Sequence, residues 1–174
     1  MRSYLTSVLM LSVLCFSGCN ADSVTPQKLP DPSIVGLWKG VNISFTGTNM
    51  SYLDSPDEPL NIISLGYDED FAFDFQENPN RFIADGSYGF MTTVSDFECS
   101  EDYMTPNNLF ETDSFWTKSG DLLTIQFLGE TTVFTIDVLT EVNLVFSAIV
   151  PFEQLMLPLD LQGEVLLSIE FERM

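Results

Sequence analysis

Apolar side chains recur at every second position along most of this chain, and this alternation limits its possible folds more than any other feature. In the segment 71–76 a phenylalanine stands at each odd position, and the same period of two recurs in 123–127, 132–138, 144–148 and 165–171. Because successive side chains of a strand point to opposite faces of a sheet, each run predicts a strand with one buried face. Beyond the N-terminal region no long segment has a helical period, so the sequence predicts an all-β domain.

Turn-forming residues separate these runs and predict how the strands connect. The segment 77–80, Glu-Asn-Pro-Asn, predicts a hairpin between 71–76 and a strand at 82–91. Gly129-Glu130 and a turn near Glu141 predict two further hairpins, and the runs 37–45, 62–67 and 164–172 bring the total to about nine strands. Such a chain folds either as an antiparallel meander barrel of about eight to nine strands, which we favour, or as a β-sandwich.

The first 18 residues have the pattern of an export signal. One basic residue, Arg2, precedes the apolar run 5–16, which is shorter than the roughly 20 residues that a membrane-spanning helix needs. The following Phe16-Ser17-Gly18-Cys19 resembles a bacterial lipobox, although Phe16 departs from its usual aliphatic residue. That resemblance implies a lipoprotein signal peptide at 1–18 and diacylglycerol attached to Cys19. The alternative is an ordinary secretory signal that leaves Cys19 as a plain thiol.

Residues 19–33 are rich in proline and small polar residues, which predicts a flexible tether between the lipidated cysteine and a domain at 34–174. Asn20 follows the cysteine where an aspartate would resemble a signal for retention in the inner membrane. We therefore expect the protein to be anchored in the outer membrane of the cell envelope. Which face of that membrane it occupies is left open.

The charge of the chain restricts its partners. It carries 26 acidic residues against six basic ones, for a net charge of −20 at pH 7. Such a charge repels nucleic acid and anionic lipid head groups, and it favours cationic partners. We therefore expect no nucleic-acid binding.

The residues that most enzymes need are missing or poorly placed. The chain has no histidine, which excludes a Ser-His-Asp triad, a Cys-His pair and a histidine metal site. The acidic neighbours of Cys99 disfavour its thiolate. A pair of carboxylates could serve a glycosidase, but 26 acidic residues produce such pairs by chance. We predict no enzyme and no cofactor.

Acidic residues cluster at 54–58, 68–70, 96–102 and 111–113, all in predicted turns or loops. None of these segments matches the twelve-residue calcium loop with its central glycine. We therefore expect solvated surface and no metal site.

Several short segments carry a family resemblance. Gly36-Leu37-Trp38 looks like the Gly-x-Trp opening of lipocalins, and the segments 115–125 and 135–146 resemble the hairpins of bacterial lipocalin-like lipoproteins. The resemblance covers about residues 34–174 and implies a lipocalin-like barrel. It also implies that Trp38 lies across the closed end with a basic residue on its ring, for which Arg173 is the candidate and Lys39 the substitute. Val41, Ile43 and Phe45 alternate out of phase with Trp38, which predicts a bulge near Gly40 if all are to face inward.

Two non-enzymatic functions fit these observations. One is a lipoprotein that holds a small apolar ligand in the barrel, lined by Phe73, Phe75, Tyr88, Ile125, Phe127, Phe134 and Ile136. These side chains could equally fill a core, since a barrel of about eight strands is just wide enough for either. The other is a structural or interaction module displayed on the cell envelope and recognised through its loops, notably the segment 92–113. A continuous cavity of a few hundred Å³ inside the barrel would favour ligand binding, whereas a solid interior would favour the interaction module.

The apolar connection 151–161 predicts either a flap across an open end, burying Leu155 and Leu157, or a core element.

Overall fold

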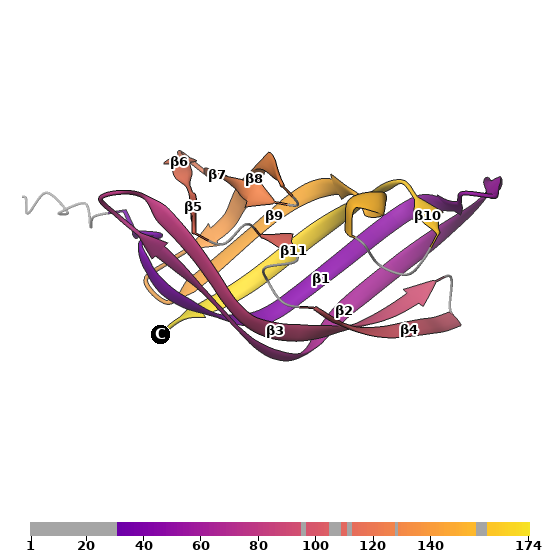
Figure 1. Cartoon of the computed structure of the whole chain (residues 1–174), viewed down its shortest axis with the longest axis horizontal. Coiled ribbons are helices and arrows are strands. Elements are labelled where there is room, and N and C mark those ends of the chain that lie inside the picture. Colours follow the sequence, from indigo (N-terminus) through magenta and orange to yellow (C-terminus); the bar gives the residue numbers. More distant parts are fainter. Residues whose placement is uncertain (1–30, 95–96, 105–108, 111–112, 128, 156–159) are drawn as a thin grey trace, which may run out of the picture. The chain divides into compact units, whose positions relative to one another are not determined.

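The computed structural model describes residues 31–94, 97–104, 109–110, 113–127, 129–155 and 160–174 (Figure 1). One compact unit comprises Pro32–Met174. The predicted signal peptide, Cys19 and most of the predicted tether lie outside the described residues. In the described ranges no helix is both long enough and apolar enough to cross a membrane.

Strands make up nearly all of this unit, as the alternating pattern predicts. They belong to one antiparallel sheet in the order β4-β3-β2-β1-β11-β9-β8-β7-β6, with β10 beside β1 and β5 beside β3. The elements are β1 (Gly36–Tyr52), β2 (Ser55–Gln76), β3 (Arg81–Val94), β4 (Phe97–Met104), β5 (Ser114–Phe115), β6 (Thr117–Ser119), β7 (Leu122–Phe127), β8 (Glu130–Leu139), β9 (Asn143–Pro151), the 3-10 helix η1 (Phe152–Leu155), β10 (Leu161–Gln162) and β11 (Glu164–Arg173).

The sheet closes on itself through one short segment. Within 114–119, β5 pairs with β3, and β6 pairs with β7 at the other end of the strand order. This segment therefore connects β3 with β7 and closes the strands from β3 to β7 into an antiparallel barrel, with β4 and β10 as additional strands. The prediction of an all-β antiparallel barrel is confirmed, and the sandwich alternative is wrong.

The predicted hairpins are present at the predicted turns. β2 ends at Gln76 and β3 begins at Arg81, and these two residues pair across the turn 77–80. Phe127 pairs with Glu130 around Gly129, and Leu139 pairs with Leu144 around the turn at Glu141. Local turn chemistry was sufficient to predict all three connections.

The acidic clusters are less confined to loops than the sequence predicts. β2 runs without a break from residue 55 to 76, so it contains the cluster 68–70 and most of the cluster 54–58. A shift of register between Tyr67 and Asp70 marks a bulge at the first of these. The bulge accommodates the extra residues without ending the strand. The predicted connection 92–113 also contains a strand, because β4 continues from β3 as a hairpin.

The predicted change of phase in the first strand is confirmed. The register of β1 against β11 shifts between Gly40 and Asn42. Trp38, Ile43 and Phe45 are all buried, whereas Val41 lies at the bulge and is exposed, so its predicted inward orientation is wrong. Gly40 lies beside this bulge, and the ring of Phe71 packs against it. A Cβ at position 40 would clash with that ring.

The connection 151–161 begins with η1, in which Phe152 and Leu155 are both buried in the core. Leu157 lies outside the described residues. Leu161 in β10 is also buried and pairs with Tyr52. The apolar residues described in this connection therefore pack onto the barrel.

Candidate functional site

All seven residues predicted to line a binding chamber point into the barrel. Phe73 and Phe75 come from β2, Tyr88 from β3, and the remaining four from β7 and β8. Each of them is buried, with at most 6% of its surface exposed. The inward face of the sheet therefore forms one aromatic interior, as the alternation predicts.

Aromatic rings from several strands meet inside this interior, and Phe110 connects those of β2 with those of β7. Phe73 on β2 lies 4.7 Å from Phe171 on β11 and 6.3 Å from Phe146 on β9, measured between ring centroids. Phe110, which precedes β5, lies 4.8 Å from Phe73 and 5.1 Å from Phe127 on β7. Aromatic pairs at these separations contribute about 0.5–1.5 kcal/mol each beyond the area they bury. In this part of the barrel the space between the walls is filled with side chains.

Three hydroxyl groups lie within the same apolar interior, farther along β2 and β3. The hydroxyls of Ser64 and Thr92 hydrogen-bond to each other at 2.7 Å, and both residues are buried. The buried hydroxyl of Tyr88 has no hydrogen-bond partner among the described residues. Burial raises the pKa of the Tyr88 phenol far above its ordinary value, so this group stays protonated and able to donate. The Ser64–Thr92 pair was not predicted, because a lone Ser or Thr in a strand carries no sequence signal for burial.

Trp38 and Arg173 meet at the seam between the first and last strands. They are direct partners in the register of β1 and β11, and the guanidinium carbon lies 4.3 Å from the centroid of the indole ring. The indole N–H of Trp38 donates to the carbonyl of Ile34 at 2.7 Å. The guanidinium donates to the carbonyls of Ser33 and Val35. These bonds fix the point where the chain enters the barrel.

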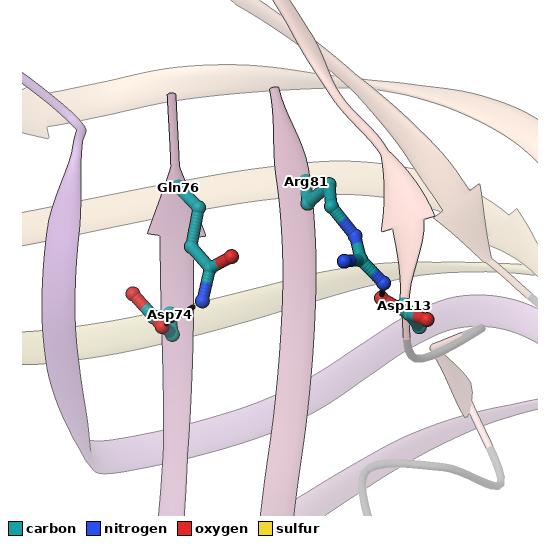
Figure 2. A network of polar contacts seen from close by, with 4 residues as sticks. All are labelled: Asp74, Gln76, Arg81 and Asp113. Atoms are coloured by element: carbon teal, nitrogen blue, oxygen red, sulfur yellow. Dashed lines mark hydrogen bonds and ion pairs between the residues drawn. The ribbon is translucent and has the colours of Figure 1, made fainter. Parts of the chain in front are cut away.

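A second tryptophan lies at the other seam, where β5 meets β3. The indole N–H of Trp116 donates to the carbonyl of Gln76 at 2.9 Å, and its ring packs edge-on against Phe75. Beside it, Arg81 forms an ion pair with Asp113, while the Gln76 amide donates to the Asp74 carboxylate on the same strand (Figure 2). Sequence reasoning placed Trp116 within a hairpin and missed its role in closing the barrel.

The described side chains offer little reactive chemistry. No group of three or more Cys, Asp or Glu residues among them is arranged to hold a metal ion. Cys99 belongs to β4, and Cys19 lies outside the described residues. Comparison of the chain with known protein families, curated proteins and solved structures finds no match.

Proposed function

We propose that this chain is a lipid-anchored interaction module of the bacterial cell envelope, with a lipocalin-like barrel that serves as a rigid scaffold and not as a ligand chamber. One observation carries the proposal. The ring of Phe110 lies 4.8 Å from Phe73 on β2 and 6.1 Å from Phe134 on β8, two strands four places apart in the strand order. A ligand in this part would therefore have to displace well-packed side chains. The outer surface is then the part of the domain available to a partner.

Two further features support the lipocalin-like type and the anchor. Trp38 lies under a basic residue contributed by the last strand, as the Gly-x-Trp resemblance implies. The described chain enters the barrel at this same seam, where the predicted tether ends. Lipid on Cys19 would therefore hold the domain through the end at which Trp38 and Arg173 meet.

Replacing Phe134 by alanine tests whether the interior is a core. Phe134 is fully buried and contacts the rings of Phe127 and Phe146. If the interior is a core, the variant loses about 3–5 kcal/mol in its free energy of unfolding and gains affinity for a small apolar fluorescent probe, because a cavity has been created. The matched control is Phe115→Ala, whose ring is exposed.

The opposite result would indicate a ligand chamber. Saturable probe binding by the unmodified protein, weakened in Phe134→Ala with little loss of stability, would overturn the proposal. Both quantities can be measured on one protein preparation, by urea unfolding and by probe titration.

One observation favours that second function. The Tyr88 hydroxyl is buried without a partner among the described residues, and such a group would bind an acceptor atom on a small apolar ligand. Tyr88→Phe should then weaken binding of an apolar probe that carries a carbonyl. In a filled core the same substitution leaves probe binding unchanged and stability equal or slightly higher, because an unsatisfied hydroxyl has been removed.

The anchor is tested separately. Cys19→Ser should leave unprocessed precursor, abolish labelling by a fatty-acid analogue and release the protein from the outer-membrane fraction. Labelling that persists in this variant would exclude lipidation at Cys19.

A further inference from the structure

The outer face of the barrel has apolar side chains where five neighbouring strands run side by side. β9, β11, β1, β2 and β3 follow one another in the sheet (Figure 1). Among the large apolar residues exposed on these strands, five on β9, β11, β2 and β3 lie in two adjacent rows, with exposed fractions from 37% for Met91 to 67% for Ile149. We call this set the outer stripe: Ile63, Leu65, Met91, Ile149 and Leu166.

The strand register brings these residues together. Ile149 pairs with Leu166, Leu166 with Thr46, and Thr46 with Ile63, so they form one row across four strands. Leu65 and Met91 pair in the adjacent row on the same face. Neighbouring strands lie about 4.8 Å apart, so five strands give a stripe about 19 Å wide. This continuity depends on pairing between distant segments and cannot be read from any one run of sequence.

A hollow of about 420 Å³ opens beside the stripe. It is lined by Leu166 and Ile149 from the stripe, by Val165, and by the polar residues Thr46, Thr48 and Glu164. The hollow therefore combines an apolar wall with two hydroxyls and one carboxylate. This volume accommodates one large side chain of a partner, and the carboxylate favours a cationic one.

The charges around the stripe are acidic. Along β11 the outward side chains run Glu164, Leu166, Ser168, Glu170, Glu172, so carboxylates lie on both sides of the apolar residue. None of the described basic residues lies in the two rows of the stripe: Arg81 pairs with Asp113, Arg173 lies on Trp38, and Lys39 and Lys118 are elsewhere. The surface thus combines apolar side chains on both sides of Thr46 with carboxylates along β11.

We propose that the outer stripe binds a segment of a partner protein in which apolar side chains alternate with lysine or arginine. The apolar side chains would pack on the stripe, and a cationic side chain would enter the hollow beside Glu164. This inference rests on the proposed interaction function and names its surface and the chemistry of its partner. A second copy of this chain fits less well, because two surfaces bordered by carboxylates, each on a chain of net charge −20, repel each other. An anionic bilayer is disfavoured for the same reason.

The test uses the full-length chain in lipid nanodiscs, so that no detergent competes for the stripe. The probe is a short synthetic peptide of alternating leucine and lysine with a fluorescent label, and binding is followed by anisotropy. The double variant Ile63→Thr/Leu166→Thr should weaken binding by about tenfold or more, because it removes two apolar contacts. Threonine keeps the strand preference of these positions, so the fold should be retained.

The matched control is Leu122→Thr/Val133→Thr, which removes two exposed apolar side chains from β7 and β8 without changing the charge. It should bind the peptide like the unmodified protein. A peptide with glutamate in place of lysine should not bind, and added salt should weaken binding of the lysine peptide. Equal affinity of the stripe variant and the control variant would overturn the proposal.

Two other results would also overturn it by assigning the stripe to a different occupant. One is a dimer that sedimentation velocity detects for the unmodified protein and not for the stripe variant, which would assign the surface to a second copy. The other is flotation with phosphatidylcholine vesicles of a chain that begins at Asn20, and so lacks both the signal segment and the lipid. Flotation that is lost in the stripe variant would assign the surface to lipid. If the peptide fails to bind while Phe134→Ala still behaves as a core variant, the interaction function stands and only this surface is excluded.

Discussion

The barrel has two seams, and each contains one of the chain's two tryptophans. At the seam of β1 and β11, register pairs extend from Trp38–Arg173 to Gly47–Val165, and Trp38 is fully buried. At the seam of β3 and β5 there are two register pairs, and Trp116 retains slight exposure. Both indoles donate a hydrogen bond to a backbone carbonyl. The difference shows that one seam is held by a long ladder, whereas the other depends on a few side chains around Trp116.

The largest expected effect follows from removing the tryptophan of the long seam. Trp38→Ala should lower the free energy of unfolding by about 3–5 kcal/mol, because the ring is fully buried and its loss leaves a cavity at the core. Urea unfolding followed by the fluorescence of Trp116 measures this. A loss below that of Trp116→Ala would reverse the comparison of the two seams.

Trp116→Ala should cost less, about 2–3 kcal/mol, because the short seam can open locally without unfolding the rest of the barrel. Hydrogen exchange distinguishes this from a global effect. Amides of β5 and β6 should exchange faster in the variant, while those of β1 and β11 exchange as in the unmodified protein under conditions where global unfolding is negligible. Uniformly faster exchange in all strands would show that the two seams open together.

These two seams also show how far the sequence could predict the fold. Strands and hairpins followed from alternation and from local turns, because both are encoded within a few neighbouring residues. The bulge at Gly40 followed from a conflict of phase between Trp38 and Ile43. The short seam was missed because pairing of Arg81 with Phe115 joins distant segments with no shared pattern. The run of β2 through the cluster 68–70 was missed because charged residues in a bulge look like those of a turn.

The candidate site, like the fold, could be predicted from the sequence only in part. Alternation placed Phe73 and Phe134 inside the barrel, but an inward phenylalanine has the same sequence pattern in a core and in a chamber. Only the contacts across the interior, which Phe110 makes with both Phe73 and Phe134, distinguish the two. The outer stripe was also missed, since Ile62 and Ile63 are adjacent apolar residues, and the sequence alone does not show which of them faces outward.

Arg173→Met tests how much the guanidinium contributes to the long seam. Methionine keeps an apolar stem against the indole but removes the cation and the bonds to the carbonyls of Ser33 and Val35. We expect a loss of roughly 1–3 kcal/mol, combining the cation–π contact with two charge-assisted bonds. Faster exchange of the amides near Val35 should accompany it. Stability equal to the unmodified protein would mean that Arg173 only covers the ring.

The smallest effect is expected at the ion pair of the short seam. Arg81 and Asp113 are both well exposed, and pairs of this kind contribute at most about 1 kcal/mol. Arg81→Gln should therefore lower the free energy of unfolding by less than that, and the difference should vanish at high salt. Asp113→Asn is the matched variant. A salt-independent loss in both would show that the pair has a structural role beyond its charge.

The place where the chain enters the barrel also determines how the domain responds to mechanical force. A pull applied at Ser33 and resisted by a partner on the outer stripe runs along β1, so the ladder between β1 and β11 is loaded in shear and many of its bonds must break together. A pull between Ser33 and Met174 would instead peel the two strands apart from Trp38 and Arg173, one pair at a time. The barrel is therefore mechanically stronger when it is held by its side than when it is held by its two ends.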